Sequence, residues 1–435
     1  MVTAAGFTML ARLTGKSSGV KSLRIAEYPG PIGLHDEQTI ARNVRAKLVD
    51  QIVAGLTAGL GEARDAAANA AWDPRAVVFT GTLDEINRHF LDQDWSDGLP
   101  IVPPTVERVE AFMRHCTEPY DKPISTLQSA NLAAVPWNIA VNGVMAGCSP
   151  EHMPILVAAA RALGDDRASL ANLGSTSMIV PYVLINGPIV EQLGLATGAQ
   201  LVSRGPNPAI GRAIGLMVRN IAGYRPGKTY MGTFGYPLVV ALAEDPKASP
   251  WPTFQVDQGF GAGQNTVTIG VTNNWGPLPA PASAGDVSAA QVALDLTMRE
   301  ITKKHRLFDF PGRGARAEKA MLTILMSPAI ARTLADEGYD KPKIKQYLYE
   351  NTRMPLREFQ WIYDYTTPGL ATISERVRAG VFPEEYLGDP ESMVRLLSSS
   401  DMVHIVVCGD PDRNRLMVLE GGHTEPTTKE IVLRQ

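Results

Sequence analysis

Cysteine is scarce in this chain. The 435 residues include three cysteines, Cys116, Cys148 and Cys408, and they lie far apart in the sequence. Small secreted proteins held together by disulfides instead use many closely spaced cysteines, usually in even number. The odd, sparse count therefore argues against a disulfide framework and predicts reduced thiols in a cytoplasmic protein.

Long apolar runs and a strong excess of one charge are missing as well. No run of about 18 apolar residues occurs, so we do not expect a transmembrane helix. The first residues, MVTAAGFTMLARL, lack the basic region, apolar core and cleavage site of a signal peptide. The formal net charge is -4, and nothing in it favours nucleic acid or an anionic membrane as a partner.

Several motifs that mark common enzyme sites are absent. The chain has no GxxxxGK[ST] loop and no strand-linked GxGxxG, so it carries no nucleotide fingerprint. The HExxH and CxxC patterns of zinc sites and the GxSxG elbow of hydrolases do not occur. The seven histidines are scattered. We therefore predict no metal site, and the sequence does not specify a cofactor.

What the chain does contain is enough apolar material for a large core. Hydrophobic residues make up 45% of the sequence and charged residues 20%, as in folded globular proteins. Apolar residues recur every three or four positions over 40–56 and 210–221, which predicts amphipathic helices. The Ala-rich segments 137–147 and 154–163 are interpreted as core helices.

Short apolar runs between these helices predict buried strands. They lie at 179–185, at 266–271, within LTILMSP and within MVHIVVCGD. The alternation of strands and helices predicts an α/β fold, with mixed sheets and packed helices.

The chain is long enough for two or three domains. Residues 1–58 are interpreted as a partial α/β unit. It consists of a helix in GFTMLARLTG, a strand at 21–28 and a helix from 37 that Asp36 caps. Residues 59–77 are interpreted as a linker, and a short strand is predicted at 76–79. Residues 78–435 form the predicted main α/β domain, with room for subdomains, and Thr82 with Glu85 predicts a capping box at its first helix.

The first candidate site is GVMAGCSPEHMP, residues 143–154. Cys148 stands just before Ser149, a good helix N-cap, and the positive end of a helix dipole can lower a thiol pKa. His152 would act as its base, and Glu151 adds a carboxylate. The alternative is a buried, inert cysteine, because the residues before Cys148 are apolar.

The second candidate site is the loop DQDWSDGLPIVPPT. Asp94 and Asp97 flank Trp95, and three prolines stiffen the chain that follows. If one carboxyl group were buried, the pair would suit general acid–base chemistry. The alternative is an ordinary Asp-Gly turn with solvated acids.

The third candidate site lies in SRGPNPAIGR and the helix that it opens. Arg204, Arg212, Arg219 and Arg225 follow one another here, and Arg212 and Arg219 share a helix face beside the apolar stripe. Arginine forks bind carboxylates or phosphates, so we predict an anion pocket. The alternative is a set of salt bridges on an amphipathic helix.

Five segments, in order along the chain, resemble one protein family. They are DWSDGLPIVPPTVERVEAFM, NIAVNGVMAGCSPEHMPILVAA, VLINGPI, IGRAIGLMVRNIAG and QYLYENTRMP. These segments resemble the long C-terminal region of the UGSC-type (seleno)proteins, and the resemblance covers most of residues 80–420. That family in turn resembles the thiol- or selenol-dependent reductases of the glycine reductase selenoprotein B kind. The resemblance implies redox or nucleophilic thiol chemistry on a small organic molecule.

The U/C-G-S-C motif that names this family does not occur in the chain. The family carries the motif in a small N-terminal α/β domain, and residues 1–58 resemble the closing part of that domain. Three explanations stay open: a partner subunit supplies the motif, the lineage has lost it, or the start is truncated. The positions that match the family's motifs are Asp94, Trp95, Asp97, Asn142, Cys148, Glu151, Arg212 and Asn220.

Three hypotheses about function follow. In the first, the chain is an enzyme subunit that acts on a small anionic organic substrate and shares thiol chemistry with a partner chain. Cys148 is then the nucleophile or thiol donor, Asp97 the general acid–base and Arg212 the anion clamp. In the second, the chain is a lyase or hydrolase that uses carboxylates alone. In the third, it is a non-catalytic partner of a separate thiol subunit. We expect a hetero- or homo-oligomer.

Overall fold

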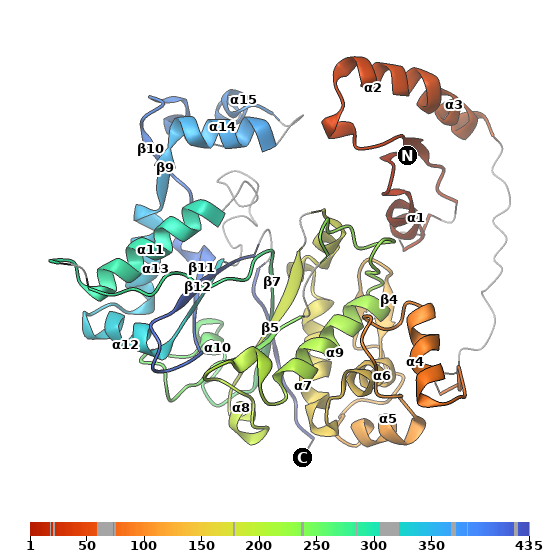
Figure 1. The fold of residues 1–435 in the computed structure, drawn as a ribbon, viewed down its shortest axis with the longest axis horizontal. Helices are drawn as coiled ribbons and strands as arrows, with labels where there is room; N and C mark the ends of the chain where they lie inside the picture. The colour runs from red at the N-terminus through yellow and green to blue at the C-terminus, as the bar shows by residue number, and fades with distance from the viewer. Residues whose placement is uncertain are drawn as a thin grey trace.

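The computed structural model describes residues 1–17, 19–20, 22–58, 73, 75–176, 179–235, 239–283, 285–304, 322–366, 371–380, 382–421 and 425–434. Two β-sheets lie in the middle of the main body, and helices cover the outer face of each (Figure 1). The predicted α/β class, with mixed sheets and packed helices, is confirmed. Among the described residues, no helix has both the length and the apolar character needed to cross a membrane.

The first sheet has the strand order β13-β7-β5-β6. Its strands are β5 (Val180–Asn186), β6 (Ala241–Ala243), β7 (Thr266–Thr272) and β13 (Thr427–Glu430). β5 pairs with β7 antiparallel and with β6 parallel, and β13 pairs with β7 antiparallel. Because alternate residues of a strand face opposite sides, Val183 and Ile185 pack on the helical side while Tyr182 and Leu184 face the second sheet.

The second sheet has the order β11-β8-β12. β8 (Leu322–Met326) runs parallel to β11 (Val403–Val407) and antiparallel to β12 (Leu416–Glu420). Leu325 shares the core between the two sheets with Leu184. The hydroxyl groups of Tyr182 and Thr323 also meet there, 2.6 Å apart. The two sheets therefore pack face to face and bury one face of each strand.

Helices cover the outer faces of this double layer. α5 (Val106–Met113), α6 (Pro136–Ala146), α7 (Met153–Leu163) and α9 (Asn207–Asn220) contribute to the largest core cluster with the first sheet. The helices over the second sheet are α11 (Ala289–Lys304), α12 (Pro328–Asp336) and α13 (Lys341–Asn351). The two groups lie on opposite sides of β5 and β7 in Figure 1.

The main body contains further helices and strands. They are α4 (Leu83–Asp92), β3 (Ser125–Leu127), β4 (Leu132–Ala134), α8 (Ile189–Gln192), α10 (Phe254–Asp257), β9 (Arg353–Pro355), α14 (Leu356–Thr366), α15 (Ile373–Arg378) and β10 (Met393–Arg395). β9, β10, α14 and α15 surround a separate aromatic core with Phe359 and Tyr386 at its centre. β3 and β4 form a two-stranded antiparallel pair.

The N-terminal residues form a βαβ unit. β1 (Val2–Ala4) and β2 (Ala26–Tyr28) pair in parallel around α1 (Thr8–Ser17). A continuous helical stretch follows as α2 (Glu37–Asn43), a π-helical turn (Val44–Leu48) and α3 (Val49–Thr57). Asp36 caps α2, as predicted, since its carboxylate accepts the Thr39 N–H at 2.7 Å.

The structure corrects two predicted strands. The strand expected over 21–28 is only the three residues of β2. The strand expected over 76–79 does not form, because Phe79 stacks on the His89 ring instead of pairing with another strand. Most of the predicted linker, 59–77, lies outside the described residues, whereas the capping box of Thr82 with Glu85 is confirmed at α4.

Candidate functional site

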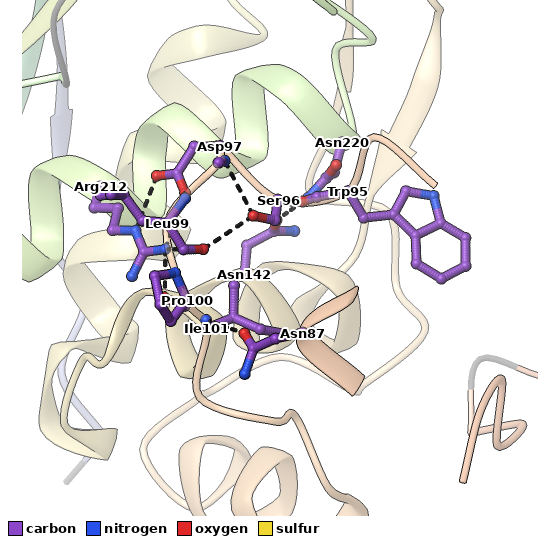
Figure 2. Close-up of polar contacts among 11 residues, drawn as sticks. Asn87, Trp95, Ser96, Asp97, Leu99, Pro100, Ile101, Asn142, Arg212 and Asn220 are labelled. Atoms are coloured by element: carbon purple, nitrogen blue, oxygen red, sulfur yellow. Dashed lines mark hydrogen bonds and ion pairs between the residues drawn. The ribbon is translucent and has the colours of Figure 1, made fainter. Parts of the chain in front are cut away.

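The loop after α4 is fastened to α9 by a two-pronged ion pair (Figure 2). Arg212 Nε lies 2.9 Å from one carboxylate oxygen of Asp97, and Arg212 Nη2 lies 2.9 Å from the other. The same Nη2 group donates to the carbonyls of Leu99 and Pro100. Only 14% of the Arg212 side chain and 16% of the Asp97 side chain are exposed, so the pair is screened only weakly by solvent.

This ion pair determines the protonation state of Asp97. Burial opposes ionisation of the carboxyl group, but the hydrogen bonds and charge of Arg212 outweigh it, so the pKa of Asp97 lies below its usual value. Asp97 therefore holds no proton at neutral pH, and both its oxygens are engaged. The geometry gives no support to the predicted acid–base role of Asp97, nor to Arg212 as a clamp for a substrate.

The start of the same loop is held at the end of α9. Arg219 Nε donates to the Asp94 carbonyl at 2.9 Å, and its Nη2 lies 3.7 Å from the Asp94 carboxylate. Lys228 donates to the other carboxylate oxygen. That hydrogen bond is the main reason why the pKa of Asp94 is lowered, and the charges of Arg219 and Arg225 add to it. Three cations thus surround one carboxylate.

Two asparagines connect this loop to α6 and α9. Asn220 Nδ2 donates to Asn142 Oδ1 at 2.8 Å and to the Trp95 carbonyl at 2.9 Å. Asn142 in turn donates to the Asn138 carbonyl, one turn earlier on α6. The Oδ1 atom of Asn220 is buried and has no hydrogen-bond partner among the described residues.

The Trp95 ring points away from the Asp97–Arg212 pair (Figure 2). It meets the rings of Phe90 and His89 edge to face, with centroids 5.4 Å and 5.6 Å apart. Trp95 is half-buried and packs against the main core. Its ring contacts with two aromatic side chains of α4 are those of an anchor for the loop.

Ser96 of the loop and Asn87 of α4 belong to this network but were not singled out from the sequence. Ser96 Oγ donates to the Leu99 carbonyl at 3.0 Å and accepts the Gly98 N–H at 3.1 Å, closing a tight turn. Gly98 has a φ of 95°, a conformation that favours glycine. Asn87 Oδ1 accepts the Ile101 N–H at 2.7 Å. The Asp-Gly turn was visible in the sequence. The role of Asn87 was not, because its hydrogen bond joins α4 to Ile101, which lies 14 residues further along the chain.

Lys228 was also missed, because a single lysine in a glycine-rich turn is a common surface residue. Its importance lies only in its approach to Asp94, which is distant in sequence. Together, Asp94, Trp95, Asp97, Asn142, Arg212, Arg219 and Asn220 form one connected network of predicted residues.

Cys148 lies at the C-terminal end of α6, in the core. Gly147 ends that helix with a φ of 84°, and the Cys148 N–H donates to the Gly143 carbonyl at 3.0 Å. The residue is 9% exposed, and burial raises the pKa of its thiol to about 12. The prediction of a lowered thiol pKa is therefore wrong. The next segment is a 3-10 turn, Pro150–His152, and α7 begins only at Met153, so no α-helix dipole starts at the cysteine.

His152 and Glu151 do not form a catalytic set with this thiol. The Ser149 N–H donates to His152 Nδ1 at 3.1 Å, so this nitrogen serves the turn as an acceptor. Burial lowers the pKa of His152, which favours the neutral imidazole. Glu151 is exposed. Within the described part of the chain, no hydrogen bond joins Cys148 to His152, and the predicted thiol–imidazole pair has no support.

No group of three or more His, Cys, Asp or Glu side chains that could hold a metal ion is found among the described residues. No family model matches the chain, and no curated protein or solved structure matches it either. The resemblance to the UGSC-type (seleno)proteins thus stays a prediction that rests on the ordered motifs.

Proposed function

We propose that this chain is one subunit of a heteromeric thiol enzyme that acts on a small anionic organic molecule. A partner subunit with a U/C-G-S-C motif supplies the reactive thiol or selenol, and this chain supplies cationic groups and the scaffold that holds them. Cys148 is then a core residue. The proposal includes a cytoplasmic location, which suits three unpaired cysteines.

The observation that carries this proposal is the thin core of the N-terminal unit. Among its described residues, the buried apolar side chains are those of Ala11, Ala26, Tyr28 and Leu48. Many others are exposed, among them Leu34 at 85% and Leu56 at 79%. A two-stranded parallel sheet is unusual by itself, because parallel strands are normally buried on both faces by further elements. Another polypeptide packed on this unit would cover both the sheet edges and the apolar side chains.

The segment that carries Arg225 and Lys228 starts next to this unit. Gly223, just after α9, lies close to Leu13 of α1, since a Cβ added at Gly223 would be 3.8 Å from Leu13 Cδ2. The chain then reaches Arg225 and Lys228, which with Arg219 outnumber the single Asp94 carboxylate. Arg225 Nε is buried without an acceptor among the described residues. The cluster therefore offers charged hydrogen-bond donors that can bind an anion.

The two other hypotheses gain less from the geometry. An enzyme that used Asp94 or Asp97 as a general acid would need that group to hold a proton near neutral pH, and the pKa values of both are lowered. A purely non-catalytic partner would have no need for the uncompensated cations around Asp94. We therefore place the anion-binding role on this chain and the thiol on its partner.

The proposal is tested by searching the neighbouring reading frames for a polypeptide with a U/C-G-S-C motif, and by preparing the chain alone and together with that polypeptide. We expect a stable complex by light scattering, and thiol-dependent turnover of small carboxylates only when both chains are present. Leu34→Asp together with Leu56→Asp should abolish the complex. Leu387→Asp, at an exposed leucine of the main body, should leave it intact.

Two outcomes would contradict the proposal. One is full activity of the isolated chain that Cys148→Ser removes while the fold survives, because the thiol would then be its own. The other is a chain that stays monomeric beside the thiol subunit and binds no part of it.

A further inference from the structure

A cavity of about 430 Å³ opens at one end of the second sheet, away from the candidate site. β8 and β11 are parallel, so their carboxyl ends, Met326 and Val407, lie at the same edge. β12 runs the other way and begins there, with Leu416 opposite Met326. In open α/β sheets, ligands bind beyond the carboxyl ends of the parallel strands. The cavity is at such an edge.

The walls of this cavity are largely apolar. Leu201 and Leu242 line it from the first sheet and its connection, and Leu325 and Met417 line it from the second. Trp275 also lines it, and 44% of that residue is exposed. Ligand pockets for small molecules have this character and a volume of several hundred Å³. An apolar or aromatic group placed here would bury the exposed tryptophan surface.

The rim of the cavity carries two arginines, Arg413 and Arg415. Arg413 lies 3.5 Å from the Asp410 carboxylate, so these two charges offset each other. Arg415 is exposed, and its guanidinium donates to the neighbouring Asn414 carbonyl, at 3.4 Å. No carboxylate within the described residues forms an ion pair with Arg415. The mouth of the cavity thus keeps a free guanidinium, which suits a carboxylate.

Ser327 adds a polar group beside this arginine. Its Oγ accepts the backbone N–H of Arg415 at 3.2 Å, which leaves the Ser327 O–H available as a donor. Cys408 lines the cavity as well, but it is 5% exposed, and burial, with the Glu244 charge, raises the pKa of its thiol to about 12. The cavity therefore offers donors for binding and no thiolate for attack.

From these observations we infer that this cavity is a binding site for a small carboxylate with an apolar or aromatic body. The body lies between Leu201, Leu325 and Trp275, and the carboxylate pairs with Arg415 at the mouth. The site is independent of the proposed function, because none of its lining residues belongs to the N-terminal unit or to the Asp94 cluster.

The test uses 3-phenylpropionate as the probe, with its neutral amide as the comparison. Titration calorimetry and ligand-observed NMR on the full chain should show one saturable site for the acid. The amide should bind about tenfold or more weakly, because it cannot form the charge-assisted pair. Arg415→Gln should weaken binding of the acid by a similar factor and leave binding of the amide unchanged.

Leu201→Trp fills the cavity from its partly buried rim, so it should abolish binding of both probes without unfolding the chain, as checked by circular dichroism. Arg434→Gln, at an exposed arginine on the Arg114 carbonyl, is the matched control and should bind the acid like the unaltered chain. Equal binding of acid and amide, binding that survives Arg415→Gln and Leu201→Trp, or no saturable binding at millimolar acid would each overturn the assignment.

Discussion

Asp97 and Arg212 are 115 residues apart in the sequence, yet their side chains meet through two hydrogen bonds of 2.9 Å each. The pair joins the loop after α4 to the middle of α9 (Figure 2). Both charges are mostly shielded from solvent. Such a pair is costly to break from one side, because the remaining charge then stays buried without a partner.

The first prediction concerns this pair. Asp97→Asn should lower the free energy of unfolding by about 2 kcal/mol, since Arg212 loses its counter-charge in a partly buried site. Urea denaturation followed by circular dichroism measures the change. Asp92→Asn, at an exposed carboxylate five residues earlier in the same region, is the control and should change stability by less than about 0.5 kcal/mol. Equal effects of the two substitutions would show that the ion pair is not a stabilising contact.

A second prediction concerns acid stability. The pKa of Asp97 in the folded chain lies below the ordinary value of 3.8. A lowered pKa means that this group stabilises the fold fully above about pH 4 and loses that contribution as the pH falls further. The unaltered chain should therefore lose stability between pH 4 and pH 2.5 more steeply than Asp97→Asn does. Parallel unfolding curves across that range would contradict the prediction.

The third prediction concerns His404, which lies in β11. Burial, assisted by the charges of Lys345 and Lys341, lowers the pKa of His404 to about 3. Neither ring nitrogen has a hydrogen-bond partner among the described residues. The imidazole is neutral in the fold but gains a proton below about pH 6.5 when the chain unfolds. Stability contributed by the neutral form is thus present above that pH and is lost as the pH falls toward 3.

His404→Leu tests this account directly. It should remove a slope of about 1.4 kcal/mol per pH unit from the free energy of unfolding between pH 6 and pH 4. At pH 8 the variant should be at least as stable as the unaltered chain, because leucine leaves no unsatisfied nitrogens in the core. An unchanged slope would mean that His404 does not titrate on unfolding.

The fourth prediction concerns Cys148. With its thiol pKa raised to about 12 by burial, the folded chain should resist iodoacetamide at pH 8 at this position, because the thiolate is the reactive form. Mass spectrometry of labelled peptides should show modification of Cys148 only after denaturation. Cys148→Ala should retain the turnover of the assembled enzyme. Rapid labelling of the native chain, together with loss of turnover in Cys148→Ala, would contradict this prediction and support a catalytic role for Cys148.

Local patterns in the sequence predicted most of the regular structure. The apolar periodicity of residues 210–221 corresponds to α9, and the Ala-rich segments correspond to α6 and α7. The Thr82–Glu85 capping box and the Asp36 cap form as predicted. These features depend on neighbours within about one helical turn, so they can be read from the sequence. The short strand expected at 76–79 does not form. A strand needs a pairing partner from another part of the chain, and its own residues do not specify that partner.

The candidate residues divide in the same way. The sequence by itself determined which residue types occur in the loop after α4 and on α9. Only the tertiary structure decided that Asp97 pairs with Arg212, that Lys228 reaches Asp94, and that Cys148 is buried with a raised pKa. The physical reason is that pairing and burial depend on contacts between distant segments, and these contacts set the charge state of each group. The same amino acids at the same spacing would have different chemistry in another fold.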